Sequence, residues 1–143
     1  MKLEDLKAKR ISDLLNQIVD QFPADMETVN INRTISEASP KITNPDNPTK
    51  MVVAVDDNQQ VKGVLTGFDI AKALQTRSVN QNDTAERIMN PNYVGVELSD
   101  TFSELALKLG MKRVDKIVVT DHGKYIGIIE RQKLASKVEE LLK

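Results

Sequence analysis

The sequence contains no cysteine and only one histidine among its 143 residues. Without cysteine, the chain can form no disulfide, offer no thiolate to a metal and use no cysteine nucleophile. A single histidine cannot by itself provide the ligands of a zinc site. These absences exclude several classes of metalloprotein and thiol enzyme, and we expect no bound metal.

The chain also lacks an excess of charge, many aromatic residues and long apolar runs. Its 20 lysine and arginine residues balance 21 aspartate and glutamate residues, and only 3% of residues are aromatic. A nucleic-acid-binding surface normally needs a basic excess, so we expect no nucleic-acid partner. No run approaches about eighteen apolar residues, and the first residues, MKLEDLKAKR, lack the apolar core of a signal peptide. We therefore expect a cytoplasmic protein without direct membrane insertion, or the soluble part of a larger assembly.

The remaining composition, 40% apolar and 29% charged, is typical of a soluble globular protein. A chain of this length suits one compact domain or two small halves that share a core. From Lys2 to Phe22, apolar residues recur at spacings of three and four, which predicts an amphipathic helix ending at the Phe22–Pro23 junction. Such a helix covers the core of its own domain, forms a dimer seam, or does both.

After this segment the same pattern occurs twice. Thr34-Ile35-Ser36-Glu37 returns as Thr101-Phe102-Ser103-Glu104, and each is a Thr-x-x-Glu capping box that starts a helix. Each box follows a short alternating segment, VNIN or VGVEL, that predicts a strand. Even the segments leading into the two halves are alike, because RISDLL resembles AERIMN.

Each half continues with two strands and a second helix. MVVAVDDNQQVKGVL (51–65) matches KIVVTDHGKYIGII (116–129), with an aspartate at the turn and a later glycine in both copies. The helices that follow are predicted at Ile70–Leu74 and Leu134–Leu142. We predict a mixed α/β fold made of two β-α-β-β-α repeats. A sheet this small leaves one face open, so the repeats are expected to pack about a pseudo-twofold axis with clefts between them.

The predicted segments are an N-terminal helix at 1–22, whose second half leads into the first repeat, repeats at 23–76 and 85–143, and a linker at 77–84.

The stretch GVLTGFDI (63–70) places Thr66 and Asp69 three residues apart at a strand-to-helix junction. They suit a third capping box, but aspartate is shorter than glutamate and should reach the cap amide less well. Gly67 would let a ligand approach the backbone closely, and a carboxylate can read the hydroxyls of a ribose. A helix start also favours anionic groups. The residues alone leave both interpretations open.

The twofold pattern, with VVAVDDNQQVKGVLTGFDIAKAL in one half and KIVVTDHGKYIGIIERQKL in the other, resembles a tandem pair of cystathionine-β-synthase (CBS) domains. The resemblance implies a regulatory module, not an enzyme, that binds an adenosine-containing ligand such as AMP, ADP or ATP in the cleft between repeats. S-adenosylmethionine and cyclic dinucleotides are further candidate ligands. It also implies a homodimer, and a ligand that changes the arrangement of repeats or protomers.

The resemblance also assigns residues. It implies that Thr66 and Asp69 contact the ribose. The residues implied to surround the adenine are Val64, Leu65, Asn92, Tyr93 and Val94, and the basic residues expected to point toward the phosphates are Lys50, Lys116, Arg131 and Lys133. Solvated surface charges are the alternative for these four, and core packing is the alternative for Tyr93.

The second repeat departs from the family pattern at its own junction, which reads Glu130-Arg131-Gln132-Lys133. A lysine in the aspartate position cannot accept hydrogen bonds from hydroxyls. We therefore expect one adenosine site per chain. A module with an empty site, serving only to dimerise or to dock onto a partner enzyme, channel or transporter, is the alternative function.

The remaining polar residues are simpler to interpret. His122, in an Asp-His-Gly sequence, is expected to be a turn residue. Asp56 and Asp57 suit a turn as well as a cation. No catalytic constellation is present that would favour an enzyme.

Overall fold

The computed structural model describes residues 1–22, 27–76 and 78–143, and the chain divides into two compact units. One unit spans residues 22–93 and is called here the β1–β3 unit. The other combines residues 1–21 with residues 94–143 and is called the β4–β6 unit. The first twenty-one residues therefore belong with the second half of the chain, although the first half follows them in sequence.

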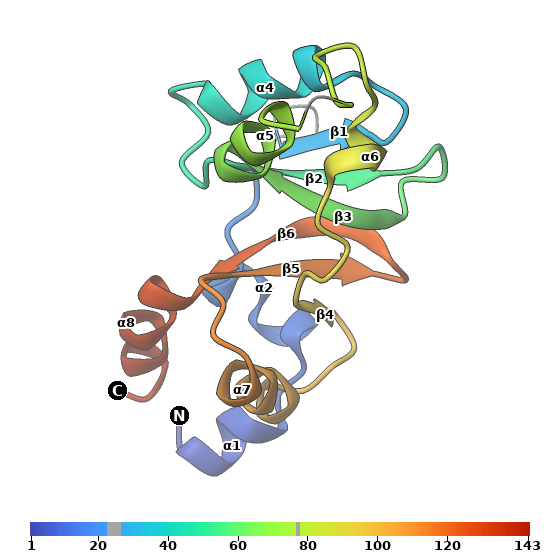
Figure 1. Cartoon of the computed structure of the whole chain (residues 1–143). Coiled ribbons are helices and arrows are strands. Elements are labelled where there is room, and N and C mark those ends of the chain that lie inside the picture. The colour runs from blue at the N-terminus through green and yellow to red at the C-terminus, as the bar shows by residue number, and fades with distance from the viewer. Residues whose placement is uncertain (23–26, 77) are drawn as a thin grey trace. The chain divides into compact units, whose positions relative to one another are not determined.

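The β1–β3 unit contains a mixed three-stranded sheet in the order β1-β2-β3. Its elements are β1 (Thr28–Asn30), α4 (Ile35–Thr43), β2 (Met51–Val55), β3 (Val61–Thr66), α5 (Gly67–Leu74) and α6 (Ala85–Ile88). The edge strand β1 runs parallel to β2, and β3 runs antiparallel to β2. Helices α4 and α5 pack on the same face of this sheet (Figure 1).

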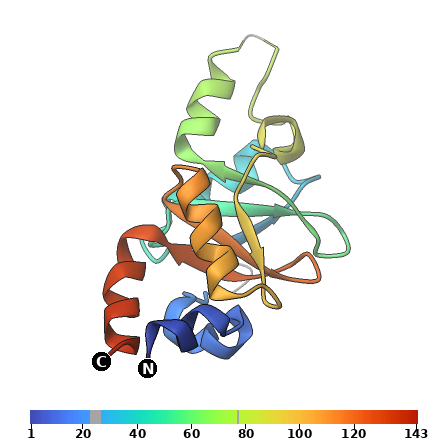
Figure 2. The same ribbon diagram turned by 90° about the horizontal axis from the view of Figure 1, so that it is seen from below.

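The β4–β6 unit repeats this topology, with β4 parallel and β6 antiparallel to the central strand β5. Its elements are α1 (Leu3–Ala8), the 3-10 helix η1 (Ile11–Leu14), α2 (Leu15–Ile18), β4 (Gly95–Glu97), α7 (Phe102–Met111), β5 (Lys116–Asp121), β6 (Lys124–Glu130) and α8 (Arg131–Leu141). The two ends of the chain lie side by side in this unit, as both views show (Figure 1 and Figure 2). The predicted mixed α/β fold with two β-α-β-β-α repeats is confirmed.

The central strands form the core of each unit because each contains a buried run rich in β-branched residues. All five residues of β2 are buried, and so are four consecutive residues of β5, Ile117 to Thr120. The two predicted Thr-x-x-Glu capping boxes are present. Glu37 N donates to Thr34 Oγ1 at 3.1 Å, and Glu104 N donates to Thr101 Oγ1 at 3.2 Å. These bonds satisfy amides that an uncapped helix start would leave unpaired.

The prediction of one continuous helix from Lys2 to Phe22 is wrong. The backbone is extended at Lys9 and Arg10, and the last helical turn ends at Ile18. The break has a long-range cause, because the main chain here bonds to the loop between β4 and α7. Ile11 N donates to Asp100 O at 2.8 Å, and Phe102 N donates to Lys9 O at 2.8 Å. An unbroken helix would direct these groups to its own turns instead.

In each unit, a lead-in segment pairs with the last strand, from before the sheet in the β4–β6 unit and from after it in the β1–β3 unit. Asp20 exchanges two main-chain hydrogen bonds with Ile128, of 2.8 and 2.9 Å, and Asn90 exchanges two with Val64, of 2.8 and 3.0 Å. A glycine precedes the paired residue in both strands. A Cβ atom on Gly127 would lie 2.6 Å from Asp20 O, and one on Gly63 would lie 2.8 Å from Asn90 O. The absence of a side chain is thus what allows the lead-in segments to approach.

No helix among the described residues combines the length and the apolar character needed to cross a bilayer.

Candidate functional site

The junction between β3 and α5 brings Thr66 and Asp69 together. Thr66 ends β3 in an extended conformation, with φ −120° and ψ 168°, and is the N-cap of α5. Asp69 N donates to Thr66 Oγ1 at 3.3 Å. In return, the Thr66 N–H and hydroxyl both donate to Asp69 Oδ2 at 2.9 Å. These contacts complete a capping box.

The expectation that an aspartate would reach the cap amide less well than a glutamate is therefore wrong at this position. Thr66 N lies 2.9 Å from the Asp69 carboxylate, whereas the corresponding Thr34 N–H lies 3.3 Å from the longer Glu37 side chain. Asp69 does stabilise the helix start. Whether it also binds a ligand depends on what the capping contacts leave available.

The capping contacts occupy only one of the two carboxylate oxygens. Both bonds from Thr66 go to Oδ2, and no described residue donates a hydrogen bond to Asp69 Oδ1. An ionised carboxylate has about four acceptor positions, so Asp69 keeps capacity for hydroxyl donors. The side of the junction at Gly67 is open, because a Cβ atom built there would meet nothing within 4 Å. Asp69 is partly exposed, and its neighbour Phe68 is 74% exposed.

The corresponding junction of the other unit, between β6 and α8, has different chemistry. Glu130 is the N-cap of α8 and makes no side-chain cap bond. Lys133, in the position of Asp69, forms an ion pair with Glu130 at 3.4 Å. This junction offers a lysine ammonium where the first has a carboxylate, and an ammonium cannot accept a hydrogen bond.

Several other predicted residues of the β1–β3 unit lie near its junction. Met51 pairs with Thr66 in the sheet, so Lys50 lies at the same end of the strands. The Lys50 ammonium donates to Asn44 O at 3.0 Å. Val64 is paired with Asn90, as described above, and Asn92 N donates to the Asn90 side chain at 2.9 Å. The bonds of Asn90 therefore hold the segment that carries the exposed Asn92 and the partly buried Tyr93 against β3.

Leu65 differs from these residues because its side chain is fully buried among the core residues of the β1–β3 unit. A ligand contact from Leu65 would have to use its main chain.

The predicted residues of the β4–β6 unit include three basic residues that lie at the same end of the unit. Lys116 pairs with Glu130 in the sheet, and Arg131 N donates to Asp115 O at 2.8 Å, so Lys116, Arg131 and Lys133 share one end of the unit. Val94 belongs to the core of the unit and is 7% exposed.

Arg113, which is not among the predicted site residues, joins Arg131 in lining an open hollow of about 480 Å3. Like Lys50, Arg113 comes just before a central strand, and this position in the sequence could have marked it as a candidate.

The turn residues behave as expected. Main-chain N–H groups of Gln60 and Asn58 donate to the Asp56 carboxylate and hold its pKa below the ordinary value of 3.8. His122 has φ 51° in the turn between β5 and β6, and its side chain is 94% exposed. Within the described residues, no group of three or more histidine and acidic side chains is arranged to hold a metal ion.

Comparison with known proteins gives the family of the chain. The model of the CBS domain matches residues 11–76 and 85–140. Among solved structures, the CBS domain protein of Streptococcus pneumoniae has a TM-score of 0.70 at 18% identity, covering 91% of this chain and 89% of that one. CBSX2, solved in complex with AMP, has a TM-score of 0.71 at 17% identity, covering 95% of this chain and 100% of that one.

A curated relative is longer than the chain. The homoserine O-acetyltransferase of Methanosalsum zhilinae is 28% identical over 122 residues, which are 83% of this chain and 24% of that protein. The chain thus spans about a quarter of the length of this relative.

Proposed function

The chain belongs to the CBS domain family, and from this premise we propose that it is a non-catalytic regulatory module that binds an adenosine-containing ligand. The ribose would lie at the junction of β3 and α5. The observation that carries this proposal is the Asp69 carboxylate, whose Oδ1 accepts no hydrogen bond from a described residue beside the open backbone of Gly67. The CBSX2 structure in complex with AMP is consistent with this class of ligand.

The chemistry of the junction suits a vicinal diol. Asp69 Oδ1 can accept hydrogen bonds from the two hydroxyls of a ribose while Oδ2 continues to cap the helix. Hydrogen bonds to a charged group contribute about 1.5–3 kcal/mol each. Capping and ligand binding are therefore compatible, and the cap holds the carboxylate in one orientation before the ligand arrives.

The other contacts remain predictions from the family resemblance. The base would meet Val64, Asn92, Tyr93 and Val94, with Leu65 contributing its main chain. The phosphates would meet basic residues drawn from Lys50, Lys116, Arg131 and Lys133. Because Lys133 replaces the ribose-binding aspartate in the second repeat, the proposal limits the chain to one adenosine site.

Binding would regulate by favouring one arrangement of the repeats, or of two protomers in a homodimer. A ligand shifts such an equilibrium only through its different affinities for the two arrangements, and couplings of about 1–3 kcal/mol are typical.

Ligand-induced stabilisation tests the proposal. A ligand at a hundred times its Kd should stabilise the folded chain by roughly 2.7 kcal/mol. We expect at least one of AMP, ADP, ATP, S-adenosylmethionine or a cyclic dinucleotide to raise the thermal midpoint. Asp69→Ala should remove that rise, because it removes the acceptor for the ribose.

Glu37→Ala is the matched control, because it breaks an equivalent capping box elsewhere in the same unit. Both variants should lower the midpoint of the unliganded protein, since loss of a cap costs about 0.5–2 kcal/mol. Only Asp69→Ala should lose the response to the ligand. The proposal fails if no member of the panel raises the midpoint, or if Asp69→Ala responds as fully as Glu37→Ala.

The similarity to an acetyltransferase favours a second candidate function. The chain matches about a quarter of that enzyme, so a CBS pair of this kind could serve as a docking module for a biosynthetic enzyme without binding a nucleotide. Solution mass measured with and without nucleotide separates the candidates. A docking module keeps the same mass in both conditions, whereas a ligand-controlled homodimer does not.

A further inference from the structure

The outer face of helix α7 presents two large apolar side chains to solvent. Leu107 is 65% exposed and Met111 is 74% exposed. They are four residues apart and therefore lie on one face of the helix, one turn from each other. The buried residues Phe102 and Leu105 hold the opposite face against the core of the β4–β6 unit.

The first repeat shows that the fold does not require this feature. Helix α4 starts from an equivalent capping box. Counted from that box, Pro40 takes the place of Leu107. Asn44, just after the end of α4, takes the place of Met111. No large apolar side chain of α4 is exposed. The exposed pair is thus particular to α7, and contiguous exposed apolar residues are a mark of interaction surfaces.

Charged residues bracket the apolar pair in a fixed order. Glu104, in the first turn of α7, is exposed, and of its two oxygens only Oε2 accepts a hydrogen bond from a described residue, the Thr101 N–H at 2.9 Å. Lys112 follows the last residue of α7, is exposed and forms no ion pair with a described residue. The helix therefore has negative charge at its start and positive charge at its end.

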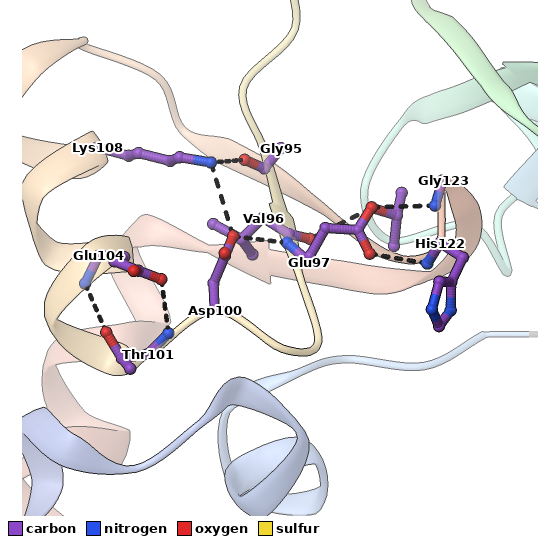
Figure 3. Close-up of polar contacts among 10 residues, drawn as sticks. Gly95, Val96, Glu97, Asp100, Thr101, Glu104, Lys108, His122 and Gly123 are labelled. Atoms are coloured by element: carbon purple, nitrogen blue, oxygen red, sulfur yellow. Dashed lines mark hydrogen bonds and ion pairs between the residues drawn. The ribbon is translucent and has the colours of Figure 1, made fainter.

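The lysine in the middle of α7 does not disturb this order (Figure 3). Lys108 Nζ donates to Gly95 O at 2.7 Å and lies 3.8 Å from Asp100 Oδ2. Figure 3 shows its side chain reaching to the edge strand β4, while Thr101 and Glu104 cap the start of the helix. The charge of Lys108 is thus committed to contacts within its own unit.

This order of charges is self-complementary when two copies of α7 pack side by side in opposite directions. Glu104 and Lys112 are eight residues apart, which is about 12 Å along a helix. In an antiparallel pair related by a twofold axis, Glu104 of each chain meets Lys112 of the partner subunit, and the opposed helix dipoles attract as well. A parallel pair would place like charges opposite each other, which is repulsive.

We infer that α7 is a homodimer interface, in which two chains pack through this helix in opposite directions. Leu107 lies near the middle of the charged pattern, so it packs close to the twofold axis, with Met111 beside it. The inference goes beyond the proposed function, because it assigns the surface that joins two protomers and requires no nucleotide. A contact with two large apolar residues per chain is small, so the dimer should dissociate on dilution.

Sedimentation equilibrium of the full chain without nucleotide tests the inference. The wild-type mass should rise with concentration from that of one chain toward that of two. Leu107→Lys should weaken the dimer at least about tenfold, because it removes an apolar contact on both sides of the axis and brings two like charges together. Leu74→Lys is the control, since Leu74 is a 48% exposed leucine of α5. It should dimerise as the wild type does.

Charge reversal gives the sharper comparison. Lys112→Glu brings two carboxylates together at each end of the interface, and Glu104→Lys brings two ammonium groups together, so each variant alone should dimerise about tenfold more weakly. An equimolar mixture of the two variants should recover the wild-type affinity, because opposite charges meet again at both ends. Glu37→Lys loses an equivalent cap and the same charge, and Lys124→Glu reverses another exposed lysine. Both controls should dimerise normally.

Three results would overturn the inference. The wild type could keep the mass of one chain at millimolar concentration, which would leave α7 to a different protein. Leu107→Lys could dimerise as well as Leu74→Lys, or the mixture of Lys112→Glu and Glu104→Lys could fail to recover the affinity that each variant loses. Because every sample lacks nucleotide, none of these results bears on the proposed ribose site.

Discussion

Ile11→Ala is expected to destabilise the protein by about 2–5 kcal/mol, the usual cost of truncating a large buried aliphatic side chain. Ile11 is fully buried although it lies near the start of the chain. Its neighbours in the core come from the β4–β6 unit, including Phe102, Leu105 and Ile129. The loss of stability should therefore appear in the second repeat, which is remote from Ile11 in the sequence.

Native-state hydrogen exchange measures where the loss occurs, because different parts of a fold can open with different free energies. Protection should fall more in β4, β5 and β6 than in β1, β2 and β3. Leu3→Ala is the control in the same segment, since Leu3 is 49% exposed and its truncation should cost little. A loss of protection confined to β1–β3 would contradict the assignment of residues 1–21 to the β4–β6 unit.

Gly127→Ala should be the most damaging of the glycine substitutions. The added Cβ would lie 2.6 Å from Asp20 O and 2.7 Å from Val19 Cγ1, so the lead-in segment would have to move. Overpacking of this kind typically costs about 1–3 kcal/mol. A further cost follows if the two main-chain bonds between Asp20 and Ile128 are lost.

Gly110→Ala is the matched control, because Gly110 lies in α7 and a Cβ there would meet nothing within 4 Å. Alanine is favoured over glycine in a helix, so this variant should gain roughly 0.5–1 kcal/mol. Urea unfolding of both variants gives the comparison. Equal stability of Gly127→Ala and the wild type would mean that Asp20 does not pack against β6 as described.

Local sequence signals predicted the helix starts well. The Thr-x-x-Glu boxes at Thr34 and Thr101 are present because a cap is made by residues three apart and needs no partner from elsewhere. The strands were predictable for a similar reason, since β-branched runs such as MVVAV have few alternatives to a buried strand. The geometry at Asp69 was less predictable, because it depends on the backbone angles of Thr66 as well as on side-chain length.

The missed features of the fold depend on contacts between distant segments. The helix break at Lys9 and Arg10 is caused by bonds to the β4–α7 loop, which no local pattern records. The likeness of RISDLL and AERIMN marked the lead-in segments, and Gly63 and Gly127 marked the strands they approach. Tertiary packing decides which lead-in segment pairs with which sheet. The sequence could therefore identify the segments and the strands but not their pairing.

The central claim is that Asp69 binds the hydroxyls of a ribose, and calorimetric titration with AMP and with its 2′,3′-dideoxy analogue tests it most directly. Two hydrogen bonds to a carboxylate should make AMP bind at least about tenfold more tightly, because 1.4 kcal/mol corresponds to a factor of ten. Equal affinities for the two nucleotides would contradict the claim and leave Asp69 as a helix cap alone.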